Sequence, residues 1–444
     1  QLKLPVDLAI EAIEREGEVI LPVSDGQPPA RIHLKLSGGQ LGAGREGQFT
    51  FSASAALAPT APVNALSANG TLAAAMDTPR TFPRLEAKIE AEARGPQFPQ
   101  GTKLSAALTA GQANAGESYT VVLEASDRKL LAVQADYPAG GVRSAGGKPL
   151  QGSWMLDMAD RDLAPFALGR PLPVFVAKGE GKFDADAALT SISASGRLAL
   201  SLDKLGVMRP ELDSFGAIKA AFDFDLVHEK DVVRVASLTA EVSGARPVLA
   251  VKSLQPFEFN FQTGAPKAAD PTKDLLSIDL QGVPLAWAQA FAPAGFALSG
   301  GDVRGAFALG VRNASAAALR ATQPLTLTNL GLTHGGKPLV QAIDLSLKLS
   351  ADYTNQGWQA ELSEVTARGA GTTTALLTLE AKAGRLAGAD QPIKATGQWT
   401  ANLVPLLAQP AATGLFVLTG GRGSGDFAAS LGSKQEIQAK IALT

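Results

Sequence analysis

The chain of 444 residues contains no cysteine. This absence excludes disulfide bonds, a thiol nucleophile and thiolate metal sites. A chain without cysteine suits a compartment that oxidises stray thiols, although many cytosolic proteins lack cysteine as well.

Charge is also scarce and evenly balanced. Charged residues make up 18% of the chain, below the roughly 25% of a typical soluble domain. The formal net charge is −2, so the chain has no strong field that would gather DNA, RNA or an anionic membrane surface. We therefore expect no nucleic-acid partner.

Long apolar helices are missing too. The uncharged stretches 283–301 and 403–420 are the best candidates for a membrane span, which needs about 20 mainly apolar residues. Proline and glycine interrupt both stretches, so each is better interpreted as a short helix, a turn and a strand. The chain begins at Gln1 without a basic segment or cleavage site, and any targeting segment would lie outside it.

Residues that carry out enzyme chemistry are few and scattered. His33 lies on the polar side of an alternating segment, His228 lies in a charged run, and His334 precedes two glycines. Each is most simply a surface or turn residue, and a histidine site assembled by folding is the less favoured alternative. We expect no catalytic residue, no metal, no cofactor and no enzymatic activity.

Two glycine-rich segments and one acidic cluster invite a ligand-binding interpretation. The segments 301–310 and 420–427 lack the Lys-Ser/Thr of a phosphate loop, and hairpin turns are favoured. Asp157, Asp160 and Asp162 precede a predicted helix and could bind a cation. Capping of that helix is the favoured role.

Most of the remaining sequence alternates with a period of two. Ile343, Leu345, Leu347 and Leu349 alternate with polar residues, and the same pattern recurs at 31–36, 85–92, 222–226 and 257–261. Such alternation predicts strands that have one apolar and one wet face, and the short turns between them predict antiparallel meanders.

One composite pattern interrupts the strands three times, at 162–183, 284–307 and 403–427. Each copy has a short apolar helical turn, a Pro or Gly break, an apolar strand, a glycine-rich turn and a Gly-x-Phe triplet. The triplets begin at Gly181, Gly305 and Gly425, with spacings of 124 and 120 residues, and an earlier triplet begins at Gly47.

Two further pairs of segments share this spacing. The segments 67–77 and 193–203 match at an offset of 126, and 238–251 resembles 364–379 at an offset of about 125. Convergent Ala, Gly and Leu composition is the alternative explanation. We predict four repeats with boundaries 1–150, 151–275, 276–395 and 396–444, the first and last incomplete.

These observations predict a mostly β fold: an elongated, curled antiparallel sheet that forms a groove, with short helices between the repeats. The helices are too few to cover the sheet, so the apolar faces must be buried by curling, by a second sheet or by a molecule other than protein. The candidate groove-lining residues are Leu34, Leu36, Phe49, Phe51, Phe222, Phe224, Phe257, Phe259, Phe261, Ile343, Leu345, Leu347 and Leu349.

The order of helix, strand, glycine-rich turn and Gly-x-Phe resembles the AsmA-like and TamB-like proteins of Gram-negative envelopes, a family of bridge-like lipid transfer repeats. The helical turns that carry the resemblance begin at Leu163, Leu285 and Val404. The resemblance implies a hydrophobic groove that carries phospholipids across the periplasm between the inner and outer membranes. It also implies phospholipids, both membranes and an outer-membrane β-barrel protein as partners.

The chain departs from that family in two respects. It has no N-terminal membrane anchor, and it stops soon after the triplet at Gly425. We therefore expect an internal piece of a larger periplasmic protein, anchored to the inner membrane through a segment that is not present here.

Two other functions are considered. One is a β-rich scaffold that assists outer-membrane protein biogenesis, with apolar faces packed on each other. The other is a parallel β-helix enzyme acting on polysaccharide, which would have rungs of roughly 20–25 residues and a carboxylate cluster. The observed period is several times longer, so this enzyme is the least favoured.

Overall fold

The computed structural model describes residues 2–3, 7–21, 30–57, 61–79, 81–113, 116–138, 150–167, 170–186, 190–293, 295–313, 316–388, 391–413, 419–431 and 435–443. The structure is 73% strand and 7% helix, with antiparallel strands that do not close on themselves. This confirms the predicted mostly β fold with few short helices. The chain divides into two compact units, Gln1–Asp203 with His228–Lys230, and Lys204–Val227 with Asp231–Thr444.

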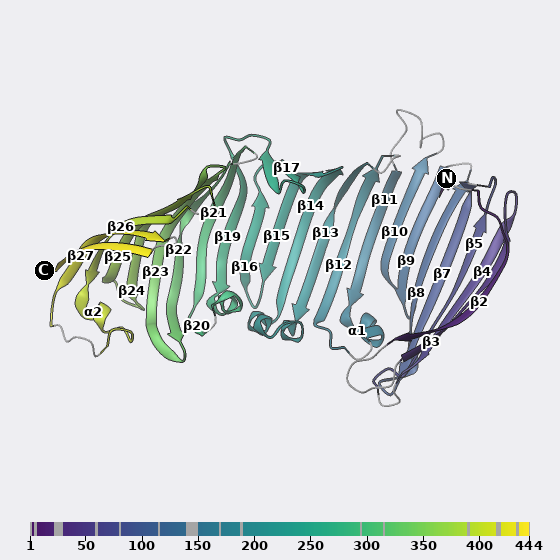
Figure 1. Cartoon of the computed structure of the whole chain (residues 1–444), viewed down its shortest axis with the longest axis horizontal. Helices are drawn as coiled ribbons and strands as arrows, with labels where there is room; N and C mark the ends of the chain where they lie inside the picture. Colours follow the sequence, from purple (N-terminus) through teal and green to yellow (C-terminus); the bar gives the residue numbers. More distant parts are fainter. Residues whose placement is uncertain are drawn as a thin grey trace. The chain divides into compact units, whose positions relative to one another are not determined.

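Unit 1 is a meander in which almost every strand pairs with the next one along the chain (Figure 1). The exceptions are β1 and β6, which pair with each other. The strands are β1 (Leu2–Lys3), β2 (Ile10–Leu21), β3 (Ala30–Leu41), β4 (Glu46–Ala56), β5 (Ala65–Ala75), β6 (Thr81–Phe82), β7 (Arg84–Gly95), β8 (Phe98–Ala113), β9 (Gly116–Ala125), β10 (Arg128–Pro138), β11 (Leu150–Ala159), β12 (Val174–Ala185) and β13 (Ser191–Asp203).

Unit 2 is a second antiparallel meander with one inserted hairpin, β17–β18, which pairs with the first half of β15. β14 (Ile218–Glu229) belongs to unit 2 as far as Val227. The other strands are β15 (Val232–Ser243), β16 (Pro247–Ser253), β17 (Phe257–Asn260), β18 (Ala265–Ala268), β19 (Asp274–Pro284), β20 (Phe296–Ser299), β21 (Asp302–Asn313), β22 (Ala316–His334), β23 (Lys337–Thr354), β24 (Gly357–Gly369), β25 (Ala375–Leu386), β26 (Ile393–Asn402), β27 (Arg422–Leu431) and β28 (Gln435–Leu443).

The register of the strands sorts the side chains of unit 1 by face, because directly paired residues point to the same side of a sheet. One row across ten strands holds only apolar residues and glycine: Leu36, Phe51, Gly70, Ile89, Ala106, Leu123, Leu131, Leu156, Gly179 and Leu198. The adjacent row on the opposite face is polar: Lys35, Ser52, Asn69, Glu90, Ser105, Glu124 and Lys129. We call these sides the apolar face and the polar face.

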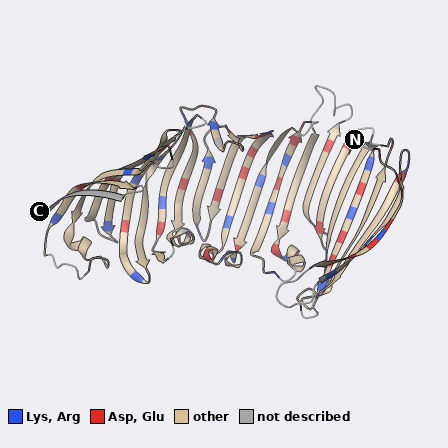
Figure 2. Cartoon of the chain, in the orientation of Figure 1, with Lys and Arg blue, Asp and Glu red and all other residues tan. Residues whose placement is uncertain are grey.

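Unit 2 is sorted in the same way. An apolar row crosses eight strands through Leu276, Leu309, Leu319, Ala351, Ala360, Ala383, Ala395 and Ala429. A row of hydroxyls crosses the polar face through Ser346, Thr366, Thr378, Thr400 and Ser424. Figure 2 shows the resulting spacing of charged residues along the strands.

Fully buried side chains in unit 1 lie at the strand ends. Leu41, Ala74 and Met76 form one cluster, which also includes Phe49 and Leu85. A second cluster, formed by Ala135, Tyr137, Leu150 and Ala185, lies at the end of β10, the start of β11 and the end of β12. The core of unit 1 is therefore divided between the rims of the sheet, with no buried cluster of this kind among the described residues at the strand centres.

Short helices lie between the strands at the three places that the sequence predicts, and also within residues 205–215, where no helix was predicted. They are α1 (Asp160–Leu163) with η1 (Ala164–Ala167), η2 (Leu205–Val207), η3 (Pro210–Phe215), η4 (Leu285–Phe291) and α2 (Leu403–Leu407). Although η1 follows β11, it also contacts β7, which is not a neighbour of β11 in the sheet. No helix in the described part of the chain has the length and apolarity needed to cross a membrane.

The predicted glycine turns are partly wrong. Gly179 and Gly181 lie in the middle of β12, and Gly423 and Gly425 lie inside β27. Of the two segments interpreted as hairpin turns, 301–310 belongs almost wholly to β21, and 420–427 enters β27 after two residues. These glycines occupy strand positions because large aromatic side chains lie over several of them.

Candidate functional site

The centre of the apolar face of unit 1 is exposed. Leu34, Leu36, Leu72, Ile89 and Val121 all lie on this face, and 36–42% of each residue's surface is accessible. Leu and Ile at the centre of an ordinary sheet would be covered by a second layer. In the described part of unit 1 the only separate sheet is the β1–β6 pair, whose Phe82 packs against the rim cluster of Leu41, Ala74 and Met76, and no helix is longer than four residues.

The total surface supports the same conclusion. The chain exposes 26508 Å². A globular protein of this mass would expose about 16,000 Å², and two separate globules of half the mass would expose about 19,000 Å² together. The chain exceeds both values, as expected of sheets that no second layer covers.

Charged side chains reach the apolar face of unit 1 only at its borders, as far as the paired residues describe it. Arg15 lies on the edge strand β2 opposite Leu36. Glu117 lies near the start of β9 and accepts a hydrogen bond from the Tyr119 hydroxyl at 2.8 Å. Arg128 lies at the start of β10 and pairs with α1. The area between them offers neither charge nor strong hydrogen-bonding groups.

The residues predicted to line a groove fall into four groups. Leu34, Leu36, Phe49 and Phe51 lie on the apolar face of unit 1, and Leu36 is paired with Phe51. Ile343, Leu345, Leu347 and Leu349 lie on the apolar face of unit 2, with Ile343 buried at its border. Phe222 and Phe224 are half-buried and alternate with exposed residues of β14.

The fourth group lies in the β17–β18 hairpin. Phe257 packs against the cluster of Ala268, Leu275 and Val311. Phe261 follows the end of β17, is 62% exposed and stacks edge-on against Phe259 with ring centroids 5.4 Å apart. The predicted alternation therefore ends at Asn260, and a lining role for these side chains stays a prediction.

Two pairs of neighbouring strands carry an arrangement that the sequence reasoning missed. On β11 and β12, Gly152 pairs with Phe183, and Trp154 pairs with Gly181. On β26 and β27, Gly397 pairs with Phe427, and Trp399 pairs with Gly425. On each strand of the pair, glycine and an aromatic residue stand two positions apart, and each aromatic residue is paired with a glycine of the other strand. We call each set of four residues an aromatic plate. The sequence does carry a signal for it: a Gly-x-Trp triplet is followed by a Gly-x-Phe triplet, and both triplets recur 244–245 residues later.

The plates are flat because glycine lies beneath each ring. A Cβ atom on Gly179, Gly181 or Gly196 would approach the Trp154 indole to within 2.5–2.8 Å. A Cβ on Gly397 would be 2.5 Å from the Phe427 ring, and one on Gly423 would be 3.2 Å from Trp399. Each ring therefore rests directly on the sheet, and Trp154 and Trp399 both stay half-buried.

One buried carboxylate fixes the short helix at the rim of unit 1. Asp162 accepts hydrogen bonds from the Arg128 guanidinium and, at 2.7 Å, from the Ala159 backbone N–H. Burial alone would raise the pKa of Asp162, but the two hydrogen bonds and the charge of Arg128 outweigh it and hold that pKa below its usual value. The capping role predicted for Asp162 is confirmed.

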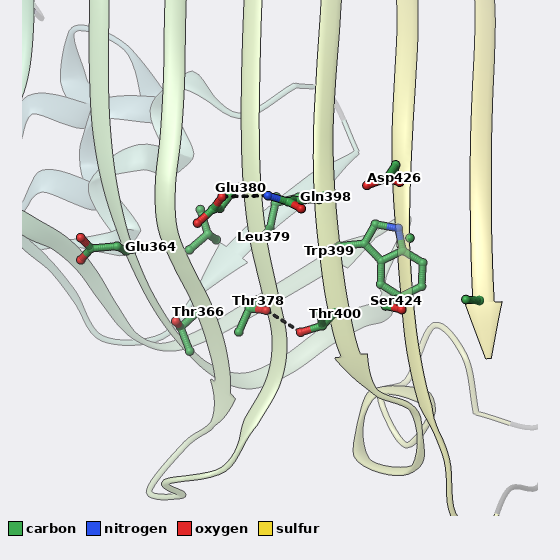
Figure 3. Close-up of a pocket in the computed structure, with 13 residues that line it drawn as sticks. Glu364, Thr366, Thr378, Leu379, Glu380, Gln398, Trp399, Thr400, Ser424 and Asp426 are labelled. Atoms are coloured by element: carbon green, nitrogen blue, oxygen red, sulfur yellow. Dashed lines mark hydrogen bonds between the residues drawn. The ribbon is translucent and has the colours of Figure 1, made fainter. Parts of the chain in front are cut away.

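A hollow of about 730 Å³ lies on the polar face of unit 2 (Figure 3). Thr378 and Thr400 share a hydrogen bond of 2.6 Å, and the Gln398 amide donates to Glu380 at 3.1 Å. Hydroxyls, carboxylates and amides of this kind can hold water or a polar molecule. Hydroxyl and carboxylate groups line the hollow, whereas histidine and lysine are absent from the residues that line it.

The remaining polar candidates are not brought together. His33 lies 3.6 Å from Glu18, and His334 stacks on Phe296 with ring centroids 4.5 Å apart. Among the residues that the structure describes, no three His, Asp or Glu side chains are grouped closely enough to hold a metal ion.

No protein-family model and no curated protein matches the chain.

Proposed function

We propose that the chain binds phospholipids through the apolar faces of its sheets and carries them along these faces in the bacterial periplasm, between the inner and outer membranes. The observation that carries the proposal is the exposed, uncharged centre of the apolar face in unit 1. Leu36 and Ile89 there keep 36% and 42% of their surface exposed. The periplasmic setting and the route between membranes rest on the resemblance to AsmA-like and TamB-like proteins.

The chemistry of the face suits an acyl chain. A diacyl lipid in water exposes apolar surface worth about 0.8 kcal/mol per CH₂ group, or roughly 25 kcal/mol for about 32 carbons. Contiguous exposed apolar patches beyond a few hundred Å² are rare on soluble monomers and mark binding surfaces. A row of apolar residues and glycine lets a chain move from strand to strand without meeting a charge, while the head group stays in water.

The uncovered face weighs against the scaffold hypothesis in its simplest form. A scaffold whose sheets pack on each other would bury Leu34, Leu36 and Ile89 within the protein. In the structure the buried clusters of unit 1 lie at the strand ends instead. A direct role in outer-membrane protein assembly would need a partner on this same face, and lipid would then compete with that partner.

Lipid mass spectrometry on gently purified protein tests the proposal. We expect several phospholipid molecules per chain in the parent protein and severalfold fewer in Ile89→Asp. The aspartate can stay hydrated in the empty face because Ile89 is 42% exposed, but contact with an acyl chain would desolvate its charge.

Thr71→Asp is the matched control. Thr71 is exposed on β5, one residue away from the row that contains Gly70 and Ile89, and it points to the polar face. The control should keep its full lipid content and the same circular dichroism melt as Ile89→Asp. A lipid-free parent protein that stays soluble and monomeric, or equal lipid loss in both variants, would overturn the proposal.

A further inference from the structure

We infer that the two aromatic plates are resident acyl-chain sites, one in each unit, where the chain of a bound lipid rests on the indole of Trp154 or Trp399. This inference rests on the proposed function and adds where along the apolar face the lipid stays longest. In plate 1 Trp154 is paired across the strands with Gly181, and in plate 2 Trp399 is paired with Gly425.

The geometry of each plate gives an acyl chain more contact than the neighbouring parts of the apolar face do. Elsewhere the face carries Leu, Ile and Val, whose branched side chains stand up from the sheet, and many Ala residues, whose single methyl group offers few atoms for contact. At a plate the indole lies over glycine, so the backbone covers one ring face, and the tryptophan as a whole is only half-buried. A chain lying against the exposed part of the ring gains dispersion contacts with several ring atoms at once.

The equivalent strand pair between the two plates lacks this arrangement. On β19 and β21, Ile278 pairs with Phe307 and Leu280 pairs with Gly305. Branched residues replace the glycine and the tryptophan, and Phe307 is buried. The protein therefore repeats the Gly-x-Phe triplet without repeating the plate, which indicates that the plate is not a requirement of the strand pairing itself.

The occupant follows from charge and hydrogen bonding at the plates. The apolar row beside plate 1 contains Leu131, Leu156 and Leu198, and the one beside plate 2 contains Leu349 and Leu362. A peptide or a sugar would leave its polar groups unpaired against such a surface, which costs free energy for each group. An uncharged hydrocarbon chain meets no such penalty.

The four tryptophans of the chain allow a direct test. They are Trp154, Trp287, Trp358 and Trp399, so four single-tryptophan proteins can be made by Trp→Phe substitution at the other three positions. Trp287 is an internal control, because it lies in η4 with its ring centroid 5.3 Å from that of Phe215. Trp358 lies at the start of β24 beside the β23–β24 turn and serves as a second control.

The probe is phosphatidylcholine whose acyl chains carry bromine at mid-chain, a contact quencher of indole fluorescence. We expect quenching at Trp154 and Trp399 that is severalfold stronger than at Trp287 and Trp358. We also expect Trp154→Leu to lower the bound lipid per chain, and Trp154→Phe to restore it, since phenylalanine keeps a flat ring.

The possible outcomes separate the plate sites from the proposed function. Lipid that binds while all four tryptophans are quenched equally, or while Trp358 is quenched most, would overturn the plate sites and leave the proposed function standing. No bound lipid and no quenching at any position would overturn both.

Discussion

Single residues decide how flat the apolar face is. Gly70 lies in the row between Phe51 and Ile89, and a Cβ atom there would fall inside the Phe51 ring. The same relation holds between Gly152 and Phe183. A large ring that lies over a glycine of the neighbouring strand makes that part of the apolar face flat.

These pairs also show where sequence reasoning stops. Alternation identified Leu36, Phe51 and Leu345 as one side of their strands, because each strand carries its own period-two signal. The glycines of β12 and β27 were interpreted as turn residues, since glycine is common in turns and its strand role depends on a tryptophan ring 24–27 positions away. That partner is set by register, which no local pattern contains.

Asp162 gives a prediction at the residue scale. We expect Asp162→Asn to lower the free energy of unfolding by about 2 kcal/mol at pH 7, because the charge-assisted bond from Arg128 is lost while the asparagine oxygen can still accept from Ala159. The folded-state pKa lies below the unfolded value of about 3.9, so this stabilisation is complete at neutral pH and disappears as the pH falls through the folded-state pKa.

Urea denaturation of both proteins at pH 7 and near pH 3 checks this prediction, and the difference between them should shrink at the lower pH. Asp160→Asn is the control, because Asp160 accepts a single bond, from the Phe175 N–H at 3.3 Å. A difference that stays constant with pH, or an equal loss in the control, would contradict the ionic account.

At the scale of elements, the helical turns occupy strand edges and rims. β23 begins at Lys337, but its pairing with β24 begins only at Ile343, which leaves the first part of that edge without a β24 partner. The turn after α2 fills the gap: Gln341 N–H donates to the Gln409 side chain at 2.9 Å, and Ala411 N–H donates to the Leu339 carbonyl at 3.1 Å. Covering an exposed edge in this way protects it from pairing with another chain.

Gln409→Ala tests this role. We expect a loss of about 1 kcal/mol in unfolding free energy and faster amide hydrogen exchange at Gln341, because the bond to that N–H is removed. Exchange should stay unchanged in Gln356→Ala, which alters an exposed residue of the β23–β24 turn. Unaltered exchange at Gln341 in the first variant would show that the α2 turn does not protect the edge.

The sequence predicted the presence of these helices but not their contacts. A break of apolar character flanked by Pro and Gly identified α1, η4 and α2 to within a few residues. Which strand each helix contacts depends on the curvature of the sheet, as with η1 and β7. Curvature arises from twist, bulges and register summed over many strands, and a local sequence pattern does not report it.

For the molecule as a whole, we propose that lipid covers an apolar face that the protein itself leaves uncovered. The lack of cysteine in the chain allows this to be measured position by position. Single cysteines on β7 would alternate between faces, with Ala87, Ile89 and Ala91 on the apolar side and Lys88 and Glu90 on the polar side. The reaction rate of each thiol with a water-soluble maleimide reports its accessibility.

The decisive measurement is this rate with and without bound phospholipid. We predict that lipid slows the reaction severalfold at positions 87, 89 and 91, leaves 88 and 90 unchanged, and that delipidation restores the fast rates. Equal rates on both faces in the presence of lipid would contradict the central claim. Slow rates at 87, 89 and 91 in lipid-free protein would show instead that the protein covers its own apolar face.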